Sequence, residues 1–309
     1  MSLQFFTRLF RLNDAWGTHT FTANPLLLRE FAQFAKVKEF SFRPYLHRHW
    51  SAQQRMDVIA NHYRLISECV PLLNLATDEC MELGKFDTEA GALRVIIDRP
   101  RWLRREGEIA LSLFLGIDRI YTTVFVLTGT ASDMKLMVGN IQGDNRERTA
   151  DYKKLTKAMH GMRPRDLLLH MLKIFSELVG CKNILGISDD AHRSRHWMTR
   201  AKKAAKYDPM WLEHGGLLLA DGFFHLPAQY RKRNDCDIPS NKRSLYRRRY
   251  EALDQLAQAF KSCLADPPAK CHFLDMHNLY LREPMTTDSA SEFQKSTGFS
   301  NLADQPAAK

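Results

Sequence analysis

Carboxylates and imidazoles gather in the stretch ILGISDDAHRSRHW, residues 184–197. Asp189 and Asp190 follow an apolar run directly, and a carboxylate beside His192 can orient a general base. Because the polar end of a sheet strand often lines a ligand crevice, Asp189, Asp190 and His192 are our candidate catalytic residues. The alternative is structural, with the aspartates capping the next helix and the histidines packing at its start. HRSRH lacks the acidic member of an HExxH motif, so no metal site is predicted.

A second segment, HGMRPRDLLLHM, has the composition of a phosphate-binding helix start. Gly161 allows close approach of the backbone, while Arg163 and Arg165 can each pair with phosphate oxygens. These three residues are our candidate cofactor-binding residues. The alternative is a helix that a proline initiates, with both arginines in water.

A third segment, SNKRSLYRRRYEALDQLAQAF, mixes cations with tyrosines. At helical spacing, Tyr246, Tyr250 and Phe260 fall on one apolar stripe, which favours burial of the tyrosines. The cations would lie along the opposite face, available to RNA, to anionic lipid or to water. The candidate residues for nucleic acid or anionic lipid are Lys242, Arg243, Arg247, Arg248 and Arg249.

Composition narrows the class of protein. The chain has 309 residues, 44% of them hydrophobic, with a net charge of +10 that favours anionic partners. Its six cysteines form no CxxC pair, which indicates a reducing, cytoplasmic setting. No transmembrane segment or signal peptide is expected, and a location peripheral on the inner membrane stays open. Walker, GxSxG and GxGxxG motifs are absent from the sequence.

The spacing of apolar residues predicts the helices and strands that position these three segments. Residues 26–80 repeat at helical spacing, and four alternating runs then predict antiparallel strands: LRVIID, EIALSLFL, RIYTTVFVL and KLMVGNIQG. Next come two helices, the strand CKNILGIS, a helix broken at Pro209, the strand or hairpin LLLADGFFHLP and a basic helix over about 241–264.

This order predicts an α+β fold with a mixed, mainly antiparallel sheet, similar to the GNAT acyltransferases. The expected divisions are a helical N-terminal subdomain (1–84), a mixed core domain (85–266) and a mobile C-terminal tail (267–309). By this fold analogy, the phosphate at the second segment would belong to an acyl-coenzyme A or acyl carrier protein donor. In GNAT proteins the phosphate loop follows the fourth strand directly and has more glycines, whereas here a helix intervenes.

Several blocks together resemble the VirK/YbjX family of bacterial proteins over about residues 40–255. They are HYRLISECV, GEIALSLFL, GNIQG, GMRPRDLLLHML, ILGISDDAHRSRHW, AKYDPMWLEHGG, GFFHLP and SNKRSLYRRRYEALD. The resemblance implies an association with virulence, envelope properties and resistance to cationic antimicrobial peptides. It supplies no catalytic residues.

Two hypotheses follow. The first is an acyltransferase-like enzyme that acts on an envelope precursor. The second is a non-enzymatic regulator of surface components that binds RNA or an anionic membrane surface through the basic helix.

Overall fold

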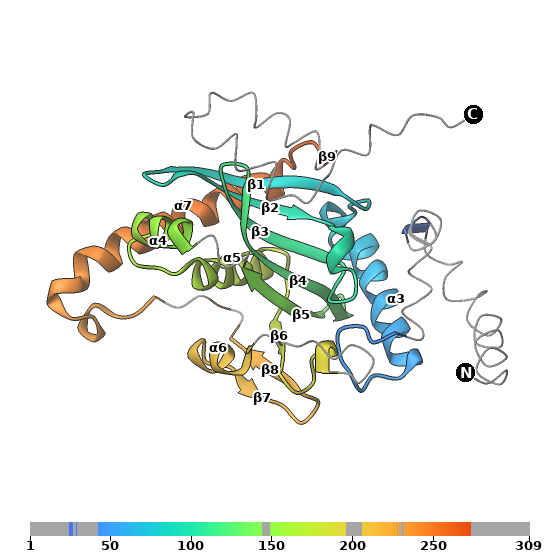
Figure 1. The fold of residues 1–309 in the computed structure, drawn as a ribbon. Coiled ribbons are helices and arrows are strands. Elements are labelled where there is room, and N and C mark those ends of the chain that lie inside the picture. The colour runs from blue at the N-terminus through green and yellow to red at the C-terminus, as the bar shows by residue number, and fades with distance from the viewer. Residues whose placement is uncertain are drawn as a thin grey trace, which may run out of the picture.

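The computed structural model describes residues 25, 26, 29, 43–143, 149–195, 206–227, 229 and 232–272. In these residues nine strands form one sheet with helices packed beside it (Figure 1). The tail predicted over 267–309 lies outside the described residues from position 273 onward.

The sheet has the order β7-β8-β6-β5-β4-β3-β2-β1-β9. Strands β1 to β5 form an antiparallel meander, β6 runs parallel to β5, and β8 runs antiparallel to β6. The prediction of an α+β fold with a mixed, mainly antiparallel sheet is therefore confirmed. The strands are β1 Glu79–Thr88, β2 Gly91–Asp98, β3 Ile109–Leu115, β4 Asp118–Thr130, β5 Asp133–Gly143, β6 Asn183–Ile187, β7 Leu217–Leu218, β8 Phe223–Leu226 and β9 Cys271–His272.

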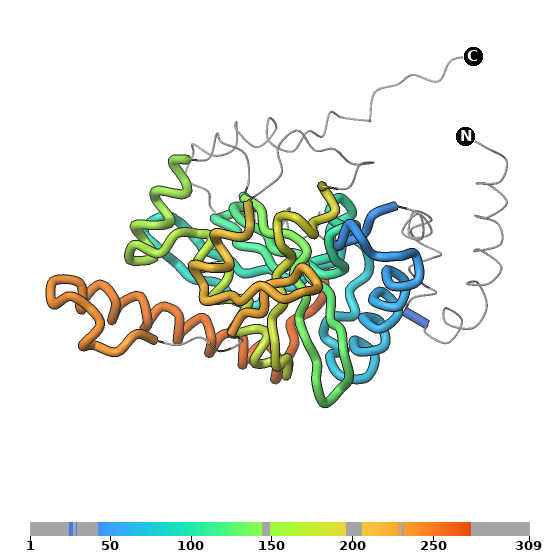
Figure 2. The backbone as a smooth tube through the Cα atoms, turned by 90° about the horizontal axis from the view of Figure 1, so that it is seen from below, coloured from blue at the N-terminus to red at the C-terminus, as the bar shows by residue number. Residues whose placement is uncertain are grey.

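In the described part of the chain the α-helices with defined bounds are α3 Ala52–Cys69, α4 Thr149–Ala158, α5 Pro164–Leu178, α6 Asp208–Glu213 and α7 Arg243–Ala265. The first begins with a capping box in which Ser51 and Gln54 bond each other's backbone N–H groups. It ends at Cys69, just before Pro71, because proline disfavours continuation of a helix. In both Figures 1 and 2, the N-terminal half of α7 projects beyond the sheet.

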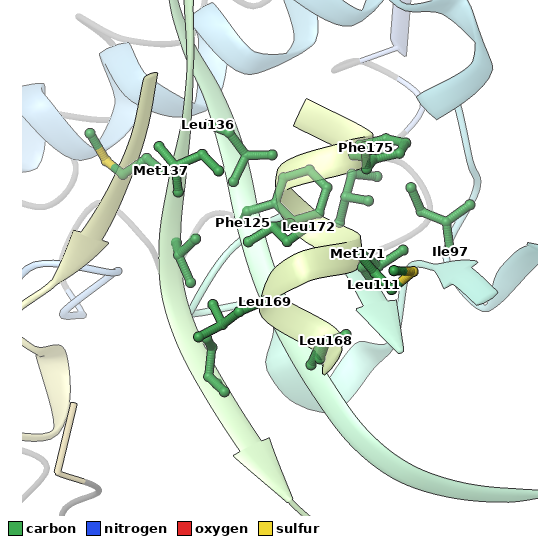
Figure 3. Packing of buried hydrophobic residues seen from close by; sticks show 14 of the residues in the cluster. Ile97, Leu111, Phe125, Leu136, Met137, Leu168, Leu169, Met171, Leu172 and Phe175 are labelled. Carbon is green, nitrogen blue, oxygen red and sulfur yellow. The ribbon is translucent and has the colours of Figure 1, made fainter. Parts of the chain in front are cut away.

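The crossover from β5 to β6 is made by α5, whose apolar face lies on the sheet. Leu168, Leu169, Leu172 and Phe175 of this helix belong to one buried cluster with Ile97, Leu111 and Phe125 of three neighbouring strands (Figure 3). The rings of Phe125 and Phe175 are 5.9 Å apart. Burial of apolar side chains on both elements is the main force that holds the helix in place.

The N-terminal helical segment is joined to the sheet by a strand and by hydrogen bonds. Strand β1, which was not predicted, spans the expected boundary at residue 84. Helix α3 is also fastened to β4, because His62 Nδ1 accepts from Leu127 N (3.0 Å) and Asn61 Oδ1 accepts from Gly129 N (2.8 Å). The division into domains at residue 84 stays a prediction.

A buried cluster of polar groups, the Glu108 cluster, joins these parts. Tyr45 donates to Glu108 Oε1 (3.1 Å), while Tyr63 and Arg99 donate to Oε2 (2.8 and 2.9 Å). Arg104 lies 3.6 Å from the same oxygen. All five residues are buried, so the carboxylate is compensated by cations and hydroxyls rather than by water.

Candidate functional site

An open groove of about 530 Å³ lies between α4, the loop that follows it and the first turn of α5. It contains all three residues predicted to bind a cofactor phosphate, Gly161, Arg163 and Arg165. We call it the α4–α5 groove. Its lining consists of Tyr121, Thr149, Tyr152, Lys153, Thr156, Lys157, Gly161, Arg163, Pro164 and Arg165.

Helix α4 supplies one wall. Lys153 and Lys157 are four residues apart and therefore lie on the same helix face, and both side chains are exposed. Within the described residues neither lysine forms an ion pair. The ring of Tyr152 lies 6.0 Å from that of Tyr121 on β4. The groove thus joins an aromatic wall to a cationic rim, which suits a ligand with an apolar part and a phosphate.

The loop between α4 and α5 is shaped by α7. Gly161 adopts a φ of +78°, which favours glycine. A side chain there would begin 3.3 Å from Arg249 Nη2. Arg249 also donates to the His160 carbonyl from Nη2 (2.8 Å) and from Nε (3.3 Å), and its guanidinium lies 4.4 Å from the Tyr246 ring centre. The groove therefore depends on a helix far along the chain.

The two groove arginines already have carboxylate partners. Arg163 donates to Asp166 Oδ2 (2.6 Å) and Glu213 Oε1 (2.9 Å), and Arg165 donates to Glu213 Oε2 (2.6 Å). Burial acts to raise the pKa of Asp166, but hydrogen bonds from His214 and Arg163 hold it well below its usual value. Hydrogen bonds to Glu213 and Asp166 raise the pKa of Arg163. A phosphate at these arginines would compete with Glu213.

The predicted catalytic aspartates contact different residues from the groove arginines. Asp189 Oδ1 accepts from the Tyr207 N–H (2.6 Å) just before α6, and the Asp189 N–H donates to Asp208 Oδ1 (2.7 Å). Asp190 is exposed and pairs with Arg48 (2.9 Å). Asp189 therefore holds the start of α6, and the catalytic assignment of both residues stays a prediction.

His192, the third predicted catalytic residue, is buried near the point where β5 and β6 separate. The two strands pair only from Lys135 to Val138, and Gly139 forms a bulge. Burial, followed by the charge of Arg193, lowers the pKa of His192 to about 4, so the imidazole is neutral at pH 7. The ring lies 5.3 Å from that of Tyr207, edge to face.

Next to His192 is a polar cluster that the sequence analysis missed. Tyr207 donates to Asn140 Oδ1 (2.8 Å), Asn140 donates to the Glu106 carboxylate, and Arg193 donates to the same carboxylate. We call these four residues the Asn140 cluster. Its one sequence signal is the polar Asn140 within the buried strand that ends in GNIQG. The cluster links four separate segments of the chain beside His192.

The cations of the basic helix α7 are in part exposed to solvent and in part packed against the loop between α4 and α5. Lys242, Arg243, Arg247 and Arg248 are exposed on its projecting end. Arg249 is half-buried and holds the His160 carbonyl. The predicted tyrosine stripe is partly buried, with the rings of Tyr246 and Tyr250 5.9 Å apart.

The described residues contain no group of three histidine, cysteine, aspartate or glutamate side chains placed to hold a metal ion. They also contain no helix whose length and apolar character would allow it to cross a membrane.

The chain is similar to proteins of several bacteria. A family described as "Protein of unknown function (DUF535)" matches residues 7–262. The uncharacterized protein YbjX of Escherichia coli K12 is 29% identical over 240 residues, 71% of this chain and 70% of that protein. An uncharacterized protein of Haemophilus influenzae is 35% identical over 141 residues, 45% of this chain and 47% of that protein. Membrane protein LapB of Mannheimia haemolytica is 25% identical over 148 residues, 46% of this chain and 62% of that protein. No solved structure matches the chain.

Proposed function

The chain belongs to the DUF535 family, which confirms the resemblance to YbjX, and on this premise we propose that it binds a phosphorylated acyl donor in the α4–α5 groove. In this proposal the donor is an acyl-coenzyme A or an acyl carrier protein, and the protein is an acyltransferase-like enzyme. The acceptor is an envelope precursor, in keeping with the link to envelope properties that the resemblance to the VirK/YbjX family implies.

One observation carries the proposal: four cationic side chains surround a groove with an aromatic wall at the start of a fifteen-residue helix. The backbone N–H groups of Arg165 and Asp166 lie in the first turn of α5, where the helix dipole favours an anion. The lysines of α4 add charge from the opposite wall, and Tyr121 and Tyr152 offer apolar surface to the rest of the donor.

The strand order supports the same choice. An antiparallel meander, a crossover helix and a parallel strand follow one another, and a bulge at Gly139 lies where β5 leaves β6. This arrangement is similar to that of GNAT acyltransferases, although helix α4 precedes the crossover helix here. The proposed phosphate site lies at the N-terminus of that crossover helix.

Thermal unfolding of the full chain tests the proposal. Coenzyme A, acyl-coenzyme A, an acyl carrier protein and inorganic phosphate are each added at increasing concentration, because a ligand of the native state raises the unfolding midpoint. A rise with the acyl donors, absent with phosphate and lost in Arg163→Ala/Arg165→Ala, is expected. Lys154→Ala is the matched control, since Lys154 is exposed on α4 outside the groove lining. No rise at saturating donor would overturn the proposal.

A second candidate function rests on α7. Its projecting end exposes Lys242, Arg243, Arg247 and Arg248, a cationic surface that fits RNA or an anionic membrane. In this alternative the chain is a non-enzymatic regulator of surface components. The relative from M. haemolytica is named a membrane protein, which favours an anionic membrane over RNA as the partner.

Binding to RNA and to anionic vesicles at several salt concentrations tests this alternative. The test variant is Arg247→Ala/Arg248→Ala, and the control is Lys261→Ala, which changes an exposed lysine at the other end of the helix. Equal affinity and salt slope in the two variants would contradict it.

A further inference from the structure

Two cysteines face each other at the edge of the sheet formed by β1 and β9. Cys80 and Cys271 are register partners in this antiparallel pair. Their sulfur atoms are 3.5 Å apart, and both are thiols in this structure. Cys80 is buried and Cys271 is half-buried.

We propose that Cys80 and Cys271 are a site of oxidative modification, at which a peroxide converts the two thiols to a cross-strand disulfide. Residues directly opposite in an antiparallel pair have Cα atoms about 4.5–5.5 Å apart, within the range that a disulfide spans. The sulfurs must approach to about 2.05 Å, which rotation of two short side chains can achieve without moving the strands.

The difference in burial assigns the order of events. Hydrogen peroxide reaches the half-buried Cys271 first, converts its thiol to a sulfenic acid and leaves one molecule of water. The Cys80 sulfur then attacks the Cys271 sulfur and the S–O bond breaks. The hydroxyl departs with the Cys80 proton as a second water, so two thiols and one peroxide give one disulfide and two waters.

A third cysteine near β1, Cys263, has no thiol partner of this kind among the described residues. Cys263 lies on α7, near the same strand, but its sulfur donates to the Leu83 carbonyl (3.1 Å) rather than facing a second thiol. Helix α7 is already packed closely on β1, since a side chain at Gly84 would begin 3.2 Å from Ala259 Cβ. A bond between Cys80 and Cys271 would fasten the segment after α7 to the same strand.

The link closes a long loop of chain. Everything from β1 to β9 lies between the two cysteines, including α7 and the groove. A cross-link of this length restricts the unfolded chain strongly, so the oxidised protein is expected to unfold at a higher temperature than the reduced protein.

The experiment uses the full chain carrying Cys236→Ser, which removes an exposed thiol that would link two molecules. The protein is treated with a small excess of hydrogen peroxide, unfolded in the presence of an alkylating agent and digested for mass spectrometry. We expect two fewer alkylated thiols, one peptide pair joined through Cys80 and Cys271, and a raised unfolding midpoint that dithiothreitol reverses.

Two further variants separate the site from general oxidation. Cys271→Ser is expected to abolish both the joined peptides and the rise in midpoint, whereas Cys263→Ser leaves both unchanged. Recovery of alkylated Cys80 and Cys271 after treatment, or a Cys80 peptide joined to Cys263 instead, would overturn the proposal.

Discussion

The Glu108 cluster and the α4–α5 groove both combine arginines with a carboxylate, and they differ in their access to water. The side chains of Glu108 and Arg99 are 1% and 2% exposed, whereas those of Glu213 and Arg163 are 49% and 55% exposed. In the buried cluster, removal of one charge leaves its partners without compensation in a region of low dielectric. In the groove, water screens each charge and another anion can replace the carboxylate.

This difference separates structural charge from charge that is available to a ligand. Both sets consist of the same residue types, so composition cannot distinguish them. Burial does, because the Glu108 cluster joins three segments of the fold while the groove arginines lie at its surface. Four variants test how far burial decides what a charged or titratable side chain does.

The largest effect is expected from Glu108→Gln. The change keeps the shape of the side chain but leaves Arg99 and Arg104 buried without their carboxylate, which costs about 3–5 kcal/mol of unfolding free energy. Urea unfolding followed by circular dichroism measures the loss. Glu213→Gln serves as the surface control, and a Glu108→Gln midpoint equal to that of the control would contradict the distinction.

Acid should destabilise the fold through His192, a buried residue outside the Glu108 cluster. Its pKa in the folded protein is about 4, below the value of about 6.5 in an unfolded chain, so the unfolded state binds more protons between these values. The stabilisation is complete above pH 6.5 and is lost as the pH falls toward 4. Between pH 7 and pH 5 the loss is about 2 kcal/mol.

Urea unfolding at both pH values checks this prediction in the wild type and in His192→Asn. The variant has no titrating group at this position, so its unfolding free energy should fall by about 2 kcal/mol less over the same interval. His170, whose pKa burial lowers to about 3, is present in both proteins and cancels. Equal losses in the two proteins would show that His192 does not titrate as its burial requires.

A smaller effect, on binding rather than folding, is expected from Lys153→Gln/Lys157→Gln. Loss of two cations from the groove rim should weaken binding of coenzyme A about tenfold, or about 1.4 kcal/mol. Isothermal titration calorimetry gives the affinity, and the urea midpoint should not change because both side chains are exposed. Lys154→Gln removes a cation from the same helix outside the groove lining and should leave the affinity near its wild-type value.

The smallest effect is expected from Glu213→Gln. The substitution removes the carboxylate that Arg163 and Arg165 share, so coenzyme A should bind about threefold more tightly. The matched control is Glu177→Gln, an exposed acid at the other end of α5. Weaker binding in Glu213→Gln would mean that the carboxylate positions the arginines rather than competing with the ligand.

The sequence predicted those parts of the fold that depend on local pattern. Alternating residues identified β2 to β5, and the helix that precedes the strand CKNILGIS is also found, as α5. Strand β1 was missed because the helical spacing identified over residues 26–80 extends into its first residues. Its pairing with β2 and β9 on either side is visible only in the folded sheet. The sequence predicted a helix broken at Pro209. In the structure Pro209 lies in the first turn of α6, where proline is tolerated, and residues 196–205 of the predicted helix lie outside the described residues.

In the candidate site, residues that are close together in the chain also lie together in the fold, and their role in binding stays a prediction. Gly161, Arg163 and Arg165 share one groove, as expected of neighbours at a helix start. The lysines of α4 were missed because nothing in the sequence shows that this helix faces the next. The Asn140 cluster was missed because its members come from separate segments that only the tertiary fold brings together.

The bond from Arg249 to the His160 carbonyl also has a consequence for protein synthesis. The loop that contains Gly161 leaves the ribosome some seconds before Arg249 does, at the usual rates of translation. During that interval the nascent chain has the residues of the groove but not the contact that holds its loop. Ligand binding at the groove would therefore mark a chain whose synthesis has passed α7.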